Sequence, residues 1–146
     1  MKWEEGWAAY CAKIDRMQAS TFDGVEHVAI ASPRPPALAQ WYVDHLAFKL
    51  IYEYSGNYFI KAPNGAVLEI IPSNGDRVAS KMYDPGLRHV AITVKDFDAA
   101  YSSLLSGNVQ FLGEPYSTPQ GHRLVFFSDC EGNILHLIQR ANPLPE

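Results

Sequence analysis

Four side chains that can bind a metal occupy matching places in two similar parts of this sequence. His27 and His89 each lie in one kind of apolar, β-branched run, and Glu69 and His136 each lie in a second kind, at nearly the same offset. Such self-similarity indicates a duplicated structural unit. The matching stretches are Val25–Ile30 with Leu87–Ile92, and Pro63–Ile71 with Cys130–Ile138.

These four residues are the candidates for chemistry. A charged or imidazole group inside a buried strand is unfavourable unless it is paired or bound to a metal. A single histidine of this kind is more often a core residue, but a repeated set needs a common cause. Three imidazoles and one carboxylate suit a divalent transition metal such as Zn, Ni, Co, Mn or Fe(II). We therefore predict a metal site formed by His27, Glu69, His89 and His136.

Composition narrows the classes of function. The 146 residues carry a net charge of −4 and no basic run, which argues against nucleic acid or an anionic membrane as the partner. No apolar run has membrane-spanning length, and the first residues lack a signal-peptide pattern. Cys11 and Cys130 do not form a disulfide framework, so we expect a cytoplasmic protein. With nucleic acid and membrane disfavoured, the expected partner is a small molecule.

The elements that must position these residues can be read from periodicity. Residues 1–24 predict an amphipathic helix that packs on the domain or on a second subunit, or forms a lid. Residues 25–72 and 87–140 predict two β-α-β-β-β modules, joined by a linker at 73–86 and followed by a tail at 141–146. The apolar stripe of the first helix consists of Trp3, Trp7, Tyr10, Ile14 and Met17.

Local signals place the elements within the modules. Asn64-Gly65 predicts a two-residue hairpin turn, and Asp96 and Gly107 are suitable caps for a helix over Phe97–Ser106. A loop is expected at Glu114–Gly121. The expected strands are Val25–Ala31, Phe48–Tyr54, Tyr58–Ala62 and Ala66–Ile71, then a strand from Leu87, Val109–Gly113, Arg123–Ser128 and Asn133–Gln139.

Several of these stretches resemble the vicinal oxygen chelate superfamily, which contains glyoxalase I, methylmalonyl-CoA epimerase, extradiol dioxygenases, and bleomycin and fosfomycin resistance proteins. The resemblance covers about residues 25–139. It implies an α+β fold in which two βαβββ modules form a pseudo-symmetric, cup-shaped mixed sheet. The stretches that carry it are Glu26–Ile30, Trp41–Phe48, Gly86–Ile92 and Phe127–Asn133.

The resemblance also implies roles for residues. The first and last strands of each module would supply the ligands His27, Glu69, His89 and His136. The sequence departs from glyoxalase I at the last of these, where that enzyme has a carboxylate that serves as ligand and base. Glu69 is then the expected catalytic base, because a metal-bound imidazole is a poor base.

Three functions remain open at this stage. The first is a metal-dependent, glyoxalase-like lyase or isomerase of a small α-hydroxy carbonyl-type molecule. The second is an Fe(II)-dependent extradiol-type dioxygenase, and the third is a non-catalytic, bleomycin-resistance-like binding protein. We expect Arg123 and Tyr116 to contact a substrate, and a homodimer in which the cup closes within one chain or between two.

Overall fold

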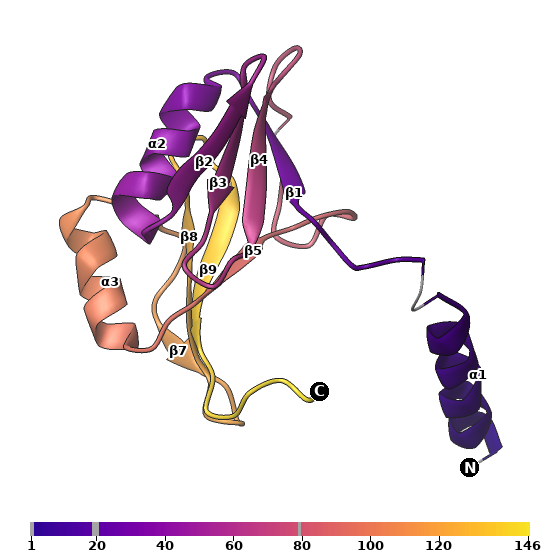
Figure 1. Cartoon of the computed structure of the whole chain (residues 1–146). Coiled ribbons are helices and arrows are strands. Elements are labelled where there is room, and N and C mark those ends of the chain that lie inside the picture. Colours follow the sequence, from indigo (N-terminus) through magenta and orange to yellow (C-terminus); the bar gives the residue numbers. More distant parts are fainter. Residues whose placement is uncertain (1, 19–20, 79) are drawn as a thin grey trace.

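The computed structural model describes residues 2–18, 21–78 and 80–146, and within the first helix it describes the side chains of residues 6–15. An N-terminal helix precedes two modules that share the order β-α-β-β-β, with one additional short strand, β7, in the second (Figure 1). The elements are α1 (Lys2–Gln18), β1 (Val28–Ser32), α2 (Pro35–Leu46), β2 (Lys49–Tyr54), β3 (Asn57–Lys61), β4 (Val67–Pro72), β5 (Val90–Thr93), α3 (Phe97–Ser106), β6 (Gln110–Phe111), β7 (Tyr116–Ser117), β8 (Arg123–Ser128) and β9 (Ile134–Gln139).

The described strands form two mixed sheets. The first has the order β1-β4-β3-β2 and the second β5-β9-β8-β6, with β7 paired to β8. In each sheet the first strand of the module runs parallel to the last, and the other pairs are antiparallel. The predicted α+β fold of two βαβββ modules is confirmed. The expected loop at Glu114–Gly121 contains the short strand β7, which sequence periodicity cannot reveal in two residues.

Local chemistry explains the helix ends and the hairpin. The Asp96 side chain accepts a hydrogen bond of 3.0 Å from the backbone N–H of Ala99 at the start of α3, as an N-cap does. The helix ends at Gly107, as predicted. Gly65 adopts φ +96°, a conformation that side chains disfavour, in the connection between β3 and β4. This connection spans residues 62–66 and closes with a hydrogen bond from the Ala62 N–H to the Ala66 carbonyl, so the prediction of a two-residue turn is wrong.

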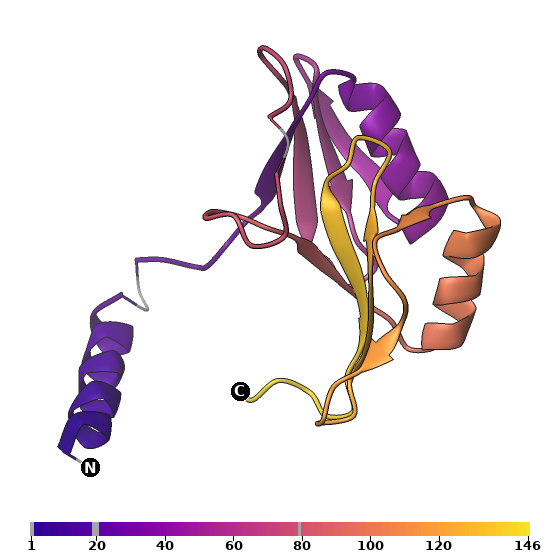
Figure 2. The ribbon, with the colours of Figure 1, turned by 180° about the vertical axis from the view of Figure 1, so that it is seen from behind.

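One hydrophobic core joins the two modules. The helices α2 and α3 cover the same side of the molecule, which leaves the opposite faces of the sheets for a site (Figures 1 and 2). The buried core residues include Leu38 and Tyr42 of α2, Ile60 and Ile70 of the first sheet, Phe97 and Leu104 of α3, and Val125, Phe127, Leu135 and Leu137 of the second sheet.

Two hydrogen bonds also connect the modules. The buried Tyr42 hydroxyl donates to Asp129 Oδ2 at 3.0 Å. The buried Ser32 hydroxyl donates to Glu131 Oε1 at 2.7 Å. Both acceptors lie in the turn between β8 and β9, so this turn holds module two against the first module.

The helix α1 lies apart from both sheets (Figures 1 and 2). Trp7 and Tyr10 stack with ring centroids 5.8 Å apart and remain 68% and 56% exposed. The predicted helix is present, but this part of its apolar stripe does not pack on its own chain. The predictions for Trp3 and Met17 lie outside the described side chains, and docking on a second subunit stays a prediction. Among the described residues, no helix is long and apolar enough to span a membrane.

Candidate functional site

The first pair of predicted ligands meets on the sheet face opposite α2. His27 immediately precedes β1, which runs parallel to β4 with Ala29 opposite Glu69. His27 Nε2 lies 3.0 Å from Glu69 Oε2, and His27 Nδ1 lies 2.9 Å from Glu26 Oε2. Asn57 Nδ2 donates to the other Glu69 oxygen at 3.1 Å. The imidazole is therefore held between two carboxylates, and Asn57 orients the inner one.

The second pair occupies the equivalent place in module two. His89 immediately precedes β5, and Ala91 lies opposite His136 in the parallel β5–β9 pair. The two rings have centroids 4.6 Å apart. Phe126 of β8 stacks on His136 with ring centroids 4.9 Å apart, and it meets the His89 ring edge to face. The equal register means that each pair shares one face of its sheet, as the repeat in the sequence requires.

His136 is a neutral imidazole that lacks a hydrogen-bond partner. Its side chain is 6% exposed, and its buried Nδ1 makes no hydrogen bond to the described residues. Burial lowers the pKa of His136 from 6.5 to about 4, with further lowering by His89 and Arg140. A neutral histidine with an uncommitted nitrogen is suited to ligate a metal.

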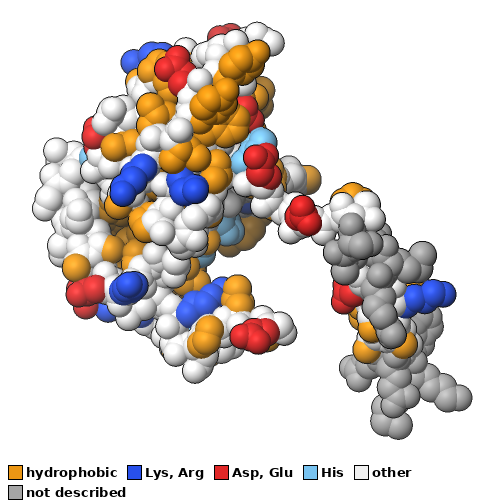
Figure 3. All heavy atoms as spheres, viewed as in Figure 1, with side chains coloured by type: hydrophobic (Ala, Val, Ile, Leu, Met, Phe, Trp, Pro, Cys, Tyr) orange, Lys and Arg blue, Asp and Glu red, His pale blue; other side chains and the backbone are white. Residues whose placement is uncertain are grey.

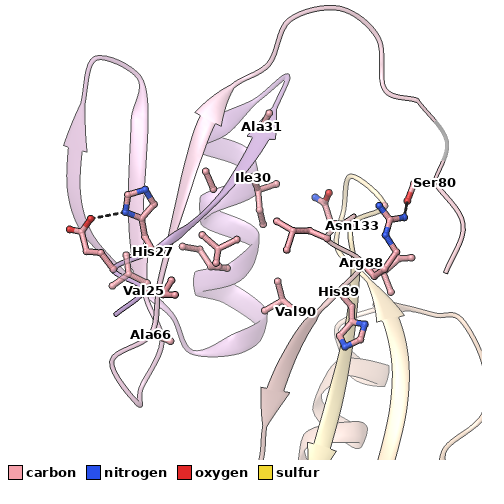
Figure 4. Close-up of a pocket in the computed structure, with 18 of the residues that line it drawn as sticks. Val25, His27, Ile30, Ala31, Ala66, Ser80, Arg88, His89, Val90 and Asn133 are labelled. Carbon is pink, nitrogen blue, oxygen red and sulfur yellow. Dashed lines mark hydrogen bonds and ion pairs between the residues drawn. The ribbon is translucent and has the colours of Figure 1, made fainter. Parts of the chain in front are cut away.

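The two pairs do not merge within one chain. Among the described residues, no group of three or more His, Cys, Asp or Glu side chains is placed to hold a metal ion. His27 and His89 nonetheless line the same pocket, of about 660 Å³, between the edge strands β1 and β5. Figure 4 shows the two histidines on opposite walls of this pocket, with apolar side chains between them. The four donors fit a divalent metal chemically, but one chain presents them as two half-sites.

The two predicted substrate contacts lie elsewhere. Arg123 pairs with Asp98 of α3 through two hydrogen bonds of 2.9 and 3.0 Å, and its guanidinium lies 4.4 Å from the Phe97 ring centroid. This contact lowers the pKa of Asp98. Tyr116 lies on β7 and is 48% exposed. Neither residue lines the pocket between β1 and β5, so their substrate role stays a prediction without support from position.

Sequence reasoning missed the polar residues of the pocket. Arg77, Ser80, Arg88 and Asn133 line it beside His89. Arg77 and Ser80 come from the segment that we interpreted only as a linker. Arg88 takes the place in the second module that Glu26 has in the first, and this exchange of charge within the repeat was the available signal.

Comparisons with known proteins agree with this architecture. The sequence profile of the Glyoxalase/Bleomycin resistance protein/Dioxygenase superfamily matches residues 24–137. No curated protein matches the sequence significantly.

Solved structures resemble the fold over nearly their whole length. A glyoxalase family protein from Enterococcus faecalis has a TM-score of 0.69 at 25% identity, covering 81% of this chain and 98% of that chain. A glyoxalase family protein from Bacillus cereus has a TM-score of 0.70 at 16% identity, with coverages of 84% and 97%. The oxidase ChaP-H2 has a TM-score of 0.65 at 22% identity, with coverages of 80% and 93%, and this likeness concerns the fold alone.

Proposed function

The chain belongs to the glyoxalase/bleomycin resistance protein/dioxygenase superfamily, and from this premise we propose that it is a divalent-metal-dependent lyase or isomerase acting on a small α-hydroxy carbonyl-type molecule. One observation supports this most directly. His27 with Glu69, and His89 with His136, occupy the same register in two equivalent parallel strand pairs. One metal bound by all four side chains explains both pairs together, whereas two unrelated structural roles would each need a separate explanation.

In the proposed site, each residue has a separate task. His27, His89 and His136 would hold the metal as neutral imidazoles, together with Glu69. The metal would supply Lewis-acid stabilisation of the negative charge that develops on a substrate oxygen. Glu69 Oε2 faces Nε2 of His27, whereas Oε1 accepts a hydrogen bond from Asn57.

Proton transfer would depend on Glu69. It is the only carboxylate of the four, and its side chain is 14% exposed. After releasing the metal, the Glu69 carboxylate would take a proton from the carbon next to a carbonyl and return it to the neighbouring carbon. His136 cannot do so while it is bound as a ligand, which is why the proposed reaction uses a single base.

We further propose that a complete site forms between two copies of the chain. One copy would supply His27 and Glu69, and the other His89 and His136. The division into half-sites within one chain supports this arrangement.

Exposed apolar side chains of β2, near the first pair, also support a homodimer. The ring centroids of Phe59 on β3 and His27 lie 5.7 Å apart, and those of Tyr52 on β2 and Phe59 also lie 5.7 Å apart. Tyr52 is 57% exposed. Figure 3 shows hydrophobic side chains gathered over this part of the molecule, close to a histidine at its right-hand edge. The other large exposed apolar residues of β2 are Leu50, Ile51 and Tyr54. Apolar surface of this extent is typical of an interaction site.

Complementation between two inactive variants tests the shared site. One variant carries His27→Ala and Glu69→Gln, and the other His89→Ala and His136→Ala. Neither should bind metal alone. The two variants are co-expressed, and the mixed dimer is purified through two different affinity tags. It should regain one of its two sites and therefore bind half as much metal per chain as the wild type. A mixed dimer without metal, beside a fully loaded wild type, would contradict closure between copies.

The reaction class is tested with the metal-reconstituted wild type and Glu69→Gln. Hydroxyacetone and the hemithioacetal of methylglyoxal with glutathione serve as probes for solvent deuterium incorporation, and catechol for oxygen uptake. The expected result is deuterium incorporation by the wild type that is lost in Glu69→Gln even when the rate is expressed per bound metal ion. Oxygen uptake without deuterium incorporation would establish the dioxygenase instead. Absence of bound metal in the wild type would favour a binding protein.

A further inference from the structure

The pocket between β1 and β5 has one cationic wall. Module one forms the first wall with β1 and the start of β4, and its one charged lining residue apart from the histidine is Glu26. The second wall comes from Arg77 and Ser80, the start of β5 and the turn between β8 and β9, and it carries the two guanidinium groups of Arg77 and Arg88. Among the described residues, neither guanidinium has a carboxylate within ion-pair distance.

Arg88 is held in place without being neutralised. Its Nη1 donates to Ser80 Oγ at 2.8 Å and to the Lys81 carbonyl at 3.0 Å, and its Nε donates to the Gly86 carbonyl at 3.3 Å. Figure 4 shows the Arg88–Ser80 contact on the wall that also carries His89. These acceptors are uncharged, so they orient the guanidinium and leave its charge uncompensated. A guanidinium fixed in this way loses little freedom when it binds an oxyanion.

Arg77 is fixed through a chain of hydrogen bonds that begins in the core. Its Nη1 donates to Asn133 Oδ1 at 3.1 Å. The Asn133 side chain donates in turn to the buried Asp129 at 2.7 Å, and its backbone N–H donates to the same carboxylate at 2.9 Å. Asn133 is therefore a rigid support, and the remaining donors of Arg77 are available to a ligand.

The space in front of these arginines is apolar. Ile30, Leu68, Val90 and Ile134 line it. A volume of about 660 Å³ suits a small organic molecule. Such a pocket favours a ligand with an apolar body and one anionic end, because the body removes apolar surface from water while the arginines bind the oxyanion.

We propose that this pocket binds a small organic anion, with a carboxylate or phosphate group on Arg77 and Arg88 and an apolar body between β1 and β5. This inference rests on the proposed function and specifies the charge of its substrate, because one histidine of each proposed half-site, His27 and His89, lines the pocket of each chain. Glu26 on the facing wall is engaged with His27, and it favours ligands that carry their charge only at the arginine end.

Matched probes test the proposal on metal-free protein, so that an anion cannot gain affinity by binding a metal. Phenylacetate and phenyl phosphate are compared with the neutral phenylacetamide by isothermal titration and NMR shift mapping, at about pH 8, where an ordinary histidine is neutral. The anions should bind roughly 10- to 100-fold more tightly than the amide, the range expected for charge-assisted hydrogen bonds. The preferred anion identifies the headgroup. Raising the ionic strength should weaken the anions selectively.

Substitutions then assign the effect to the two arginines. Arg77→Gln and Arg88→Gln should each weaken anion binding roughly 10-fold and leave phenylacetamide binding unchanged. Arg34→Gln is the matched control, because Arg34 is exposed at the start of α2 and does not line the pocket. Arg88 also holds residues 80–86, so thermal midpoints are compared, and Arg77→Gln serves as the variant without that role.

The results that would overturn the anion site differ from those that would overturn the proposed function. Equal binding of the anions and the amide, equal losses for both kinds of probe in the arginine variants, or no binding by any probe at millimolar concentration would each overturn the proposal. Metal content and deuterium incorporation, measured on wild-type protein, report separately on the proposed function. An enzyme that binds metal and turns over a neutral probe while failing the anion test would refute the anion site alone.

Discussion

Replacing Tyr42 by Phe should destabilise the contact between the two modules. The Tyr42 ring is fully buried in α2, and its hydroxyl donates to Asp129, which is 5% exposed in the turn after β8. Burial, with Asp129, raises the pKa of the Tyr42 hydroxyl well above its ordinary value. The hydroxyl is therefore a proton donor at neutral pH, and the substitution removes one hydrogen bond while preserving the packed ring.

The size of the effect follows from what remains at Asp129. A hydrogen bond to a charged group contributes about 1.5–3 kcal/mol. Asp129 keeps three other donors after the substitution, namely the backbone N–H groups of Glu131 and Asn133 and the Asn133 side chain. Because the carboxylate is not left unpaired, we expect a loss of about 2 kcal/mol in the free energy of unfolding. For a chain of this size that lowers the thermal midpoint by about 4–8 °C.

Urea unfolding and calorimetry measure the loss, with Tyr101→Phe as the control. Tyr101 is half-buried between Phe97 and Phe111, and its hydroxyl makes no hydrogen bond within the described part of the chain. Its substitution should cost less than about 0.5 kcal/mol. In an Asp129→Asn background the cost of Tyr42→Phe should shrink. Equal losses in the two tyrosine variants, or an unchanged cost in the Asp129→Asn background, would refute the reasoning.

Three further predictions concern the site and the first helix. In metal-free protein, His136 should contribute about 3 kcal/mol of stability that is present above pH 6.5 and lost as the pH falls toward 4, because its folded pKa of about 4 lies below the ordinary 6.5. The free energy of unfolding of His136→Gln, measured in urea, should therefore depend less steeply on pH over that range than that of the wild type. Parallel pH dependences of the two proteins would contradict this. Glu69→Gln keeps the side-chain volume but removes the charge, so metal content should fall on elemental analysis while the fold persists, and full occupancy would exclude Glu69 as a ligand. Deletion of residues 1–20 should lower the thermal midpoint or dissociate a dimer in light scattering, and no change in either would show that α1 has no such role.

Short-range patterns in the sequence predicted the elements of each module and the shared face of its two candidate ligands. Side chains alternate along a strand, so the matching runs around His27 and His89 predict matching faces. The structure bears this out, since Glu69 lies opposite Ala29 and His136 lies opposite Ala91. The ends of α3 were equally predictable, because an N-cap and a C-terminal glycine act within one helical turn.

Which residues of different elements come together at the candidate site could not be predicted from the sequence. Arg123 was expected at a substrate, but α3 brings Asp98 beside it. The residues of 73–86 carry no periodic pattern, and only the folded chain places Arg77 against Asn133 in the wall of the pocket. Contacts of this kind join residues far apart in the sequence, and no local rule encodes them.

The sequence by itself predicted two equivalent modules that each carry two candidate metal ligands on one face, because strand periodicity is a local property and the repeat is visible in the sequence. Only the tertiary structure decided how those pairs are distributed. Within the described residues, the two sheets share no strand pairing and leave His27 with Glu69 apart from His89 with His136. The relative placement of the sheets depends on the packing of α2 and α3 in a shared core, which is a property of the whole fold.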